Sequence, residues 1–580
     1  MKAKTIYTAA IVLLSVISSC FDHNKYKSGN QSVPIDDNSP TAILLQMTMQ
    51  NASDSVLLNF RGKGLHTSKL IQKFYALNKN YPVWTSGMEP NHFANELIRL
   101  LSRAQYYGLD TSFYQYTDLK ELRHSLENRK DSNINKKVLE FELLMTHNCF
   151  KLMSHLHVGL LNADTALYGE HLVKYPRNFP DKLMNFINND KLGDGILDLQ
   201  PKSYEYRRLQ KGLELFLNQM TLSDDSFQMP DPAIDSVLAY KKAKEILIAY
   251  NYINIDAYKN EYIASTFDKM KKIGPSPEIA DDFYPIITNQ DSLFFMSLKE
   301  FQKDNGLSTD GKIGLNTQKA LQINNRDRFE QIAINLERLK WEKPRPSKYV
   351  YVNVPAYKLR VIDSFTIVKT FNLGVGTPWT ETPMLNSKIE YFTTNPEWYV
   401  PYSISTKELL PKAKEDSTYL ERHNYRIYDK ERVPVSYVDW SEVERSNFSY
   451  FFQQAAGAGN ALGKIKFYFE NPYIVYIHDT PDKSKFNKDI RAYSHGCMRI
   501  QDPAEFAKTL LNLEPNNRAD SVDFWIDSGS RKIVNFLEPI QLYVRYITCE
   551  ADSKSQITFY QDIYNKDKKL KKQFFAQKDF

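Results

Sequence analysis

The segment Val475-Tyr-Ile-His478-Asp-Thr-Pro481 is followed, after fifteen residues counted from His478, by Ser494-His495-Gly496-Cys497-Met-Arg499. The β-branched and aromatic residues from Val475 to Ile477 predict a strand that ends at His478, and the Gly496-Cys497 step predicts a tight turn. A thiol attacks a carbonyl as its thiolate, which a nearby base or positive charge favours. We therefore interpret Cys497 as a nucleophile and His478 as its base.

An isolated cysteine and histidine are more often a buried small hydrophobe and a hydrogen-bonded strand residue. The Ser-His-Gly-Cys string favours the catalytic interpretation, because a glycine beside a thiol frees backbone N–H groups to face a developing oxyanion. Strand ends and turns are also where rigid scaffolds present reactive side chains.

The two segments resemble the signature of the L,D-transpeptidase family, whose catalytic domain is of the YkuD type. That signature is a histidine, about fifteen residues, and then Ser/Thr-His-Gly-Cys, a hydrophobic residue and usually Asn. Arg499 stands at the last position, as in the large periplasmic YcbB-like subfamily with a helical scaffold. Further pieces of the resemblance lie between residues 375 and 467: Val375-Gly376, Thr382-Pro383, Asn395-Pro396, Trp398 to Pro401, Asn460-Ala-Leu-Gly463 and Lys466-Phe467.

The resemblance implies an enzyme that acts on peptidoglycan without a metal or organic cofactor. Cys497 would attack the third residue of a stem tetrapeptide and release D-Ala. An amine of a neighbouring stem would then resolve the thioester into a 3→3 crosslink. His478 would take the thiol proton and later serve the amine, while Asp479 would orient the imidazole through its backbone carbonyl. A direct role of the Asp479 carboxylate stays open.

The resemblance also implies the remaining site residues. The N–H groups of Gly496 and Cys497 would hold the oxyanion, with Tyr476 or His495 as a further donor. Arg499 suits recognition of a stem carboxylate, because its guanidinium is planar. Ser494 and Trp398 are expected to bind substrate.

Two alternatives stay open. Water could resolve the thioester, which would make the protein an L,D-carboxypeptidase or an endopeptidase with the same Cys/His site. The chain could instead be a catalytically silent wall-binding lipoprotein. The presence of His478, His495, Gly496 and Cys497 at workable spacing argues against that second alternative.

Composition is that of a multidomain globular protein. The chain has 580 residues, of which 42% are hydrophobic and 25% charged, enough for about three domains with cores of their own. The net charge of +6 is small for this length, and no dense Lys/Arg stripe with interleaved aromatics supports nucleic-acid binding. No CxxC pair or His/Cys cluster indicates a zinc site.

The N-terminus predicts export and a lipid anchor. Lys2 and Lys4 precede an apolar run from Ile6 to Ile17 that is short for a membrane span. The run ends Ile17-Ser-Ser-Cys20, which resembles a lipobox with Cys20 as the lipidated residue; an ordinary signal peptide is the alternative. We expect a periplasmic lipoprotein anchored to a membrane, with a signal peptide at 1–19. Its expected partners are stem peptides, glycan strands and wall-synthesis proteins that the sequence does not identify.

The expected fold class is multidomain α+β. Leucine periodicity predicts an all-helical scaffold that includes His155 and His157, two structural histidines on different sides of one helix. Cys149 and Cys549 are expected to be inert and buried. The expected divisions are a polar tether at 20–65, the scaffold at 66–283, a peptidoglycan-binding-like module at 284–325, a connecting helix at 326–347, a mostly-β catalytic domain at 348–545 with a helical, mobile cap at about 404–450, and a C-terminal extension at 546–580.

The module is predicted from two short helices around a glycine-punctuated turn. Phe301-Gln302, Gly306-Leu307, Asp310-Gly311 and Gly314 resemble the small helical peptidoglycan-binding module. Whether the module binds glycan, or is a spacer whose apolar residues close a small core, stays open.

Overall fold

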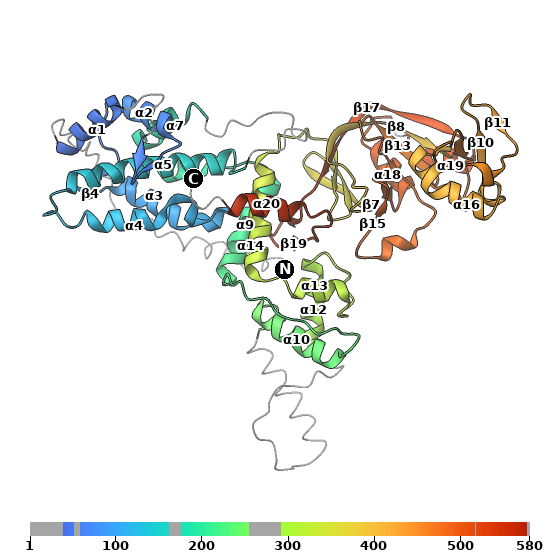
Figure 1. Ribbon diagram of the computed structural model, residues 1–580, viewed down its shortest axis with the longest axis horizontal. Helices are drawn as coiled ribbons and strands as arrows, with labels where there is room; N and C mark the ends of the chain where they lie inside the picture. The colour runs from blue at the N-terminus through green and yellow to red at the C-terminus, as the bar shows by residue number, and fades with distance from the viewer. Residues whose placement is uncertain (1–38, 52–57, 162–175, 255–291, 517, 577–580) are drawn as a thin grey trace, which may run out of the picture.

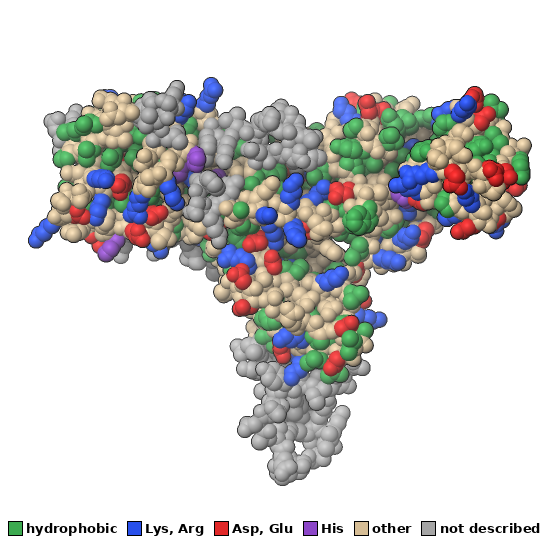
Figure 2. Space-filling model, in the orientation of Figure 1, with side chains coloured by type: hydrophobic (Ala, Val, Ile, Leu, Met, Phe, Trp, Pro, Cys, Tyr) green, Lys and Arg blue, Asp and Glu red, His purple; other side chains and the backbone are tan. Residues whose placement is uncertain are grey.

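The computed structural model describes residues 39–51, 58–161, 176–254, 292–516 and 518–576. A helical unit and a β-sheet domain extend to opposite sides of a central group of helices, and a small helical module projects from that centre (Figure 1). This confirms the predicted α+β class. Lys/Arg and Asp/Glu side chains are interspersed over the visible face of the molecule (Figure 2). None of the helices within the described ranges is both long and apolar enough to cross a membrane.

The N-terminal helical unit is built around α5 (Ile134–His157), which is buried along most of its length. The single core of this unit is shared by residues from every helix around α5. The other helices that the structure describes in this unit are α1 (Pro40–Asn51), α2 (Ser68–Leu77), α3 (His92–Ser102), η1 (Ala104–Tyr107), η2 (Thr111–Tyr114), α4 (Tyr116–Ser125), α7 (Phe179–Asn188) and α8 (Leu192–Leu197).

Two predictions for this unit are corrected. The tether predicted at 20–65 includes α1, whose Ala42 and Leu45 are fully buried, and α1 packs against α5. The apolar residues of α1 form a consecutive run from Ala42 to Leu45, which lacks the spacing typical of an amphipathic helix. The scaffold predicted as all-helical also contains two short hairpins. They are β1 (Asn59–Phe60) with β2 (Lys63–Gly64), and β3 (Thr85–Ser86) with β4 (Glu89–Pro90).

The predicted histidine and cysteine roles in α5 are confirmed. Nδ1 of His155 lies 3.0 Å from the Tyr114 hydroxyl inside the core, whereas the exposed His157 ring contacts the Leu199 carbonyl at 2.9 Å. Cys149 is fully buried, and burial raises the pKa of its thiol well above the usual range. These residues stabilise the scaffold.

The connecting helix α14 (Asn325–Lys340) is buried on nearly all sides. Ala333 and Ile334 belong to the core of the helical unit, while Ile332 and Leu336 pack with α9 (Tyr204–Gln219) and the C-terminal extension. α14 thus lies between the core of the helical unit and the C-terminal extension. The extension folds back as β18 (Cys549–Ala551), β19 (Ile557–Phe559) and α20 (Lys566–Phe575), with Cys549 fully buried as predicted.

Among the residues that the structure describes, three helices form the small module, not the predicted two. Besides α12 (Ser292–Asp304) and α13 (Leu315–Leu321), α10 (Ser236–Ala249) supplies part of the core, so the predicted start at residue 284 is too late. Phe301 is fully buried, and the Gln302 carboxamide donates to the Lys312 carbonyl and accepts from Gly311 N. The residues that carry the resemblance therefore close the core and turn of the module itself.

The β domain is a nine-stranded sheet that closes on itself, because β7 pairs with β6 as well as with β16. Phe506 of α18 (Pro503–Leu511) packs against Phe467 in its core, and α19 (Ser521–Asp527) adds Val522. The strands are β5 (Tyr349–Asn353), β6 (Lys358–Asp363), β7 (Thr366–Gly376), β8 (Leu385–Thr394), β13 (Ile465–Phe469), β14 (Ile477–His478), β15 (Ala492–Ser494), β16 (Met498–Ile500) and β17 (Lys532–Arg545).

The strand predicted at 475–477 begins later, at Ile477. The Asn471 side chain accepts a hydrogen bond from Val475 N at 3.1 Å and donates to Val475 O at 2.8 Å. Ile474 adopts a left-handed backbone conformation, with a φ of 57°. Val475 is thus held by a local turn, and only Ile477 and His478 pair as a strand.

The cap predicted as helical is a mixed α/β insertion. It contains a four-stranded antiparallel sheet in the order β11-β10-β12-β9 and a core that includes Leu409, Trp440 and Phe452. Its strands are short and lie within charged sequence, so the alternation of apolar and polar residues that predicts a strand is not apparent there. Its elements are β9 (Trp398–Tyr399), α15 (Tyr402–Ile404), η3 (Ser405–Leu409), α16 (Leu410–Glu415), α17 (Tyr419–Arg422), β10 (Tyr425–Tyr428), β11 (Pro434–Val435), η4 (Trp440–Glu442) and β12 (Phe451–Gln454).

Candidate active site

Alternation along the central strands separates a core face of the sheet from a site face. Ile477 of β14 and Met498 of β16 are fully buried in the core. Because successive side chains point to opposite faces, their neighbours His478 and Arg499, which pair with each other, lie on the other face. Lys466 of β13 pairs with His478 from the opposite side. Three adjacent strands therefore place Lys466, His478 and Arg499 side by side.

The loop that carries Cys497 is held in a fixed shape by hydrogen bonds. Gly496 has a φ of 108°, a conformation that residues with a Cβ rarely adopt. Ser494 Oγ accepts from Gly496 N at 3.1 Å and donates to Cys497 O at 2.6 Å. The Ser494 carbonyl accepts from Thr377 N at 3.0 Å and from Thr380 Oγ1 at 2.9 Å. This loop therefore presents the thiol from a well-defined backbone.

Two predicted roles in this loop are corrected. Ser494, expected to bind substrate, is buried and uses its hydroxyl within the loop. Gly496 N, expected in the oxyanion hole, donates to that hydroxyl. The Cys497 N–H makes no hydrogen bond to the described residues, so it is the backbone donor left beside the thiol.

The Cys497 thiol is half-buried next to Tyr476. Burial raises the pKa of the thiol, whereas the backbone and hydroxyl of Tyr476 and the charges of Lys466 and Arg499 lower it. Burial and the neighbouring Cys497 also raise the pKa of Tyr476, so its hydroxyl stays protonated at neutral pH. Lys466 Nζ lies 3.9 Å from the centroid of the Tyr476 ring. Negative charge at this position is thus surrounded by one hydroxyl donor and two cations.

The His478 imidazole is neutral at physiological pH. Burial and the charge of Arg499 lower its pKa to about 3, with smaller contributions from Lys466 and Lys483, while the Asp479 backbone acts in the opposite direction. Its ring centroid lies 5.5 Å from that of Tyr476. Within the described part of the chain Nδ1 has no hydrogen-bond partner, and the imidazole does not bond the Cys497 thiol. A neutral imidazole can accept a proton, and catalytic hydrogen bonds often tighten only when substrate binds.

The Asp479 carboxylate is occupied by groups other than the imidazole. It accepts from Lys464 N at 2.7 Å, from Thr480 N at 2.7 Å and from Lys483 Nζ at 2.5 Å. These bonds stabilise the turn before β13. None of these bonds involves the imidazole, and the role expected for the Asp479 backbone carbonyl stays a prediction.

His495 contacts the cap. Its Nε2 lies 2.6 Å from Glu408 Oε1 of η3, and both side chains are about half exposed. The loop that holds Cys497 is therefore joined to the cap by this contact. The structure assigns His495 to that contact instead of the expected oxyanion hole, because its side chain extends to the cap.

Arg499 and Trp398 lie near Tyr476, and their expected role in substrate binding stays a prediction. The Arg499 guanidinium lies 5.3 Å from the Tyr493 ring centroid, and its buried Nε has no hydrogen-bond partner among the described residues. The Trp398 indole lies close enough to the Tyr476 hydroxyl to lower the pKa of Tyr476. The indole Nε1 of Trp398 nevertheless has no hydrogen-bond partner among the described residues. Trp398 thereby brings the first strand of the cap to the thiol. Cys20, the predicted lipidation site, lies outside the described residues.

Lys466 and Thr382 are site residues that sequence reasoning did not single out by role. Both residues belong to segments that resemble the family, and no other feature of the sequence pointed to them. Lys466 reaches the site through its pairing with His478, and Thr382 Oγ1 donates to Gly496 O at 2.8 Å. Within the described ranges no group of three or more His, Cys, Asp or Glu side chains could hold a metal ion.

A large cleft lies away from this site. It has a volume of about 1510 Å³ and runs between α9 and the outer strands β5 and β6. Tyr204, Arg345, Tyr351 and Phe365 line it, and Cys497 does not. The chemistry therefore belongs to the cap side of the sheet and not to this cleft.

A half-buried thiol, a neutral imidazole and flanking donors on a closed sheet define a site suited to acyl transfer through cysteine. Residues 347–523 match the model of the L,D-transpeptidase catalytic domain, YkuD, and residues 69–213 match that of the Scaffold domain. A Haemophilus influenzae protein named "Putative L,D-transpeptidase" is 35% identical over 184 residues, which cover 31% of this chain and 37% of that relative. The match thus spans little more than a third of the relative's length. The chain carries an L,D-transpeptidase catalytic domain and a scaffold domain.

Proposed function

We propose that this protein is an L,D-transpeptidase that forms 3→3 crosslinks between peptidoglycan stem peptides. The observation that carries the proposal is the placement of the Cys497 thiol beside Tyr476, Lys466 and Arg499, on the sheet face that also holds the neutral His478. This face lies within the residues that match the catalytic domain.

The first half-reaction cleaves the bond to the terminal D-Ala. His478 takes the proton of the Cys497 thiol, and the thiolate attacks the carbonyl carbon of the third residue of the stem. The Cys497 N–H and the Tyr476 hydroxyl donate to the oxyanion, a kind of interaction that contributes about 3 kcal/mol per donor. The C–N bond then breaks, the D-Ala amine takes the proton from His478, and a thioester remains on Cys497.

The second half-reaction transfers the acyl group. An amine of a second stem attacks the thioester carbonyl and loses a proton to His478. The C–S bond breaks, the proton returns to Cys497 and a new amide joins the two stems. Arg499 and Lys466 suit a substrate that carries carboxylates, because each offers a cation at the site face.

The proposal places the protein in the periplasm with a lipid anchor on Cys20. Its support is the basic, apolar and Ser-Ser-Cys20 order of the first twenty residues. Stem peptides and glycan strands are the proposed partners, and the α10–α12–α13 module is the proposed contact with glycan. That contact would use the outer surface of the module, since Phe301 and Gln302 are buried.

The experiment is mass spectrometry of the purified chain after incubation with a disaccharide tetrapeptide, for the wild type and Cys497→Ala. A Cys497-dependent dimer that has lost one D-Ala supports the proposal. Monomeric tripeptide alone would establish an L,D-carboxypeptidase. Absence of both product and acyl adduct would contradict the enzymatic function. Cys149→Ala is the matched control, because that thiol is fully buried in the scaffold and its loss should leave the products unchanged.

A further inference from the structure

The Thr382 hydroxyl connects two loops next to the nucleophile. It donates to Gly496 O at 2.8 Å and accepts from Gly376 N at 2.9 Å. The Thr382 residue is only 1% exposed, so water cannot easily replace these bonds. Thr382 therefore holds the peptide group immediately before Cys497 against the end of β7.

The bond to Gly496 O also orients a donor. The carbonyl of Gly496 and the N–H of Cys497 belong to one planar peptide group and point in opposite directions. A hydrogen bond that fixes the carbonyl thus fixes the direction of the Cys497 N–H, the backbone donor beside the thiol. Misalignment of a single oxyanion donor is costly, because its benefit depends on a preorganised position.

Tyr564 of the C-terminal extension holds Thr382 in turn. Its hydroxyl donates to Gly376 O at 2.7 Å and accepts from Thr382 N at 3.1 Å. Tyr564 lies outside residues 347–523, which match the catalytic domain. A residue of the C-terminal extension thus links Gly376 to Thr382, the residue whose hydroxyl bonds Gly496.

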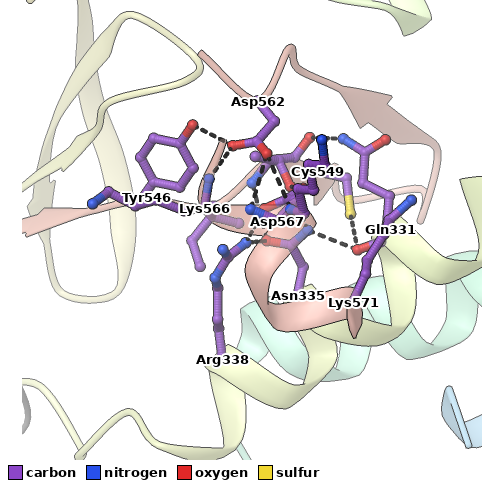
Figure 3. Close-up of polar contacts among 12 residues, drawn as sticks. Gln331, Asn335, Arg338, Tyr546, Cys549, Asp562, Lys566, Asp567 and Lys571 are labelled. Atoms are coloured by element: carbon purple, nitrogen blue, oxygen red, sulfur yellow. Dashed lines mark hydrogen bonds and ion pairs between the residues drawn. The ribbon is translucent and has the colours of Figure 1, made fainter. Parts of the chain in front are cut away.

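A polar network anchors Tyr564 to α14. Tyr564 N donates to the Tyr546 hydroxyl at 2.8 Å, and that hydroxyl donates to Asp562 Oδ1 at 2.6 Å. Asp562 accepts from Asp567 N at 2.9 Å, and Asp567 pairs with Arg338 of α14 at 2.7 Å. Figure 3 shows Tyr546, Asp562, Asp567 and Arg338 in this network. Hydrogen bonds thus run from the helix that joins the domains to the peptide group before the nucleophile.

We propose that Thr382 is a positioning residue that aims the Cys497 N–H at the oxyanion, and that Tyr564 acts through Thr382. The inference deepens the proposed function, since it concerns the same thiol. It assigns the C-terminal extension a task in addition to its packing against α9 and α14.

The test compares two reactions of Cys497 in the full-length chain. p-Nitrophenyl acetate acylates a thiol: the thiolate attacks the ester carbonyl, an oxyanion forms, and p-nitrophenolate leaves. Iodoacetamide alkylates the same thiol at a saturated carbon with loss of iodide and forms no oxyanion. Both adducts are assigned to Cys497 by peptide mass spectrometry. Only the acylation depends on a Cys497 N–H that is oriented toward the oxyanion.

Thr382→Val removes the hydroxyl at nearly constant shape, and Thr382→Ser keeps it. We expect Thr382→Val to slow acylation at least tenfold while alkylation stays within twofold of the wild type, and Thr382→Ser to restore acylation to within threefold. Equal loss in both reactions would show a merely structural role, and unchanged acylation would also overturn the proposal. A wild-type thiol that is alkylated but never acylated would likewise contradict it.

Tyr564→Phe removes the hydroxyl and keeps the ring, which stacks on Tyr546 at a centroid distance of 5.4 Å. We expect a three- to tenfold loss of acylation alone. Tyr560→Phe is the matched control, since its hydroxyl bonds Glu550 at 3.2 Å in the same extension and should leave acylation unchanged. Equal effects of the two variants would remove Tyr564 from the proposal. If the wild type reacts with the ester but not with a disaccharide tetrapeptide, the proposed function fails and the positioning role stands.

Discussion

His495 Nε2 lies 2.6 Å from Glu408 Oε1, so the residue just before Gly496 is joined to the η3 segment of the cap. Exposed ion pairs of this kind contribute about 0 to 1 kcal/mol. Such a contact can shift the position of the cap only modestly, so its loss should be measurable without unfolding the protein.

Glu408→Gln should loosen the cap without unfolding the protein. Loss of up to about 1 kcal/mol corresponds to roughly a fivefold rise in opening, which hydrogen exchange at residues 402–422 would report. The control is Glu444→Gln, which removes an ion pair with Lys414 inside the cap. If both variants raise exchange equally, the His495 contact has no special role in cap position.

The low pKa of His478 predicts acid sensitivity of the β domain. The folded pKa of about 3 lies below the unfolded value of about 6.5, so the unfolded state binds more protons between these two values. The stabilising effect of the neutral ring is complete above pH 6.5 and is lost as the pH falls toward 3. The loss should reach up to about 4 kcal/mol.

The measurement is hydrogen exchange in β13, β14 and β16 at several pH values between 7 and 4. His478→Gln, which cannot protonate, should flatten the acid-dependent rise in exchange. His147→Gln is the control, because His147 is a buried histidine of the scaffold with a pKa also lowered to about 3. A rise in the β strands that survives in His478→Gln would assign the sensitivity to other groups.

Gly463→Ala should destabilise the β domain more than Gly457→Ala. Both glycines have a left-handed φ, but a Cβ at Gly463 would collide with the Asp479 carboxylate, whereas one at Gly457 would meet open space. We expect costs of about 3 and about 1 kcal/mol respectively, measured as the decrease in urea midpoint of the β domain. Similar midpoints would show that Asp479 moves freely.

Cys20→Ala should release the protein from membranes, because one lipid-modified residue would provide the anchor. The measurement is the fraction of protein that sediments with membranes after high-salt washing. The same distribution for Cys20→Ala and the wild type would remove the lipid anchor and leave an ordinary signal peptide.

Local patterns predicted the parts of the fold that depend on near neighbours. The strands β5, β6 and β13 and the helix α18 follow alternation or apolar clustering in their own residues. Cys497 and His478 were identified from two short segments. The predictions that failed concern α1, whose apolar residues lack helical spacing, and the strands of the cap, which are too short for a clear alternation. Contacts with other elements bury their apolar side chains.

The sequence by itself determined which groups carry the chemistry, because the Cys497 thiol and the His478 imidazole are reactive by virtue of their side-chain types and their local turn and strand. Only the tertiary structure decided what surrounds them. The β14 register sets Lys466 beside His478. Thr382 bonds Gly496 across 114 residues of chain, and Tyr564 bonds Gly376 across 188. Register and long-range hydrogen bonds arise from packing of the whole domain, which no local pattern encodes.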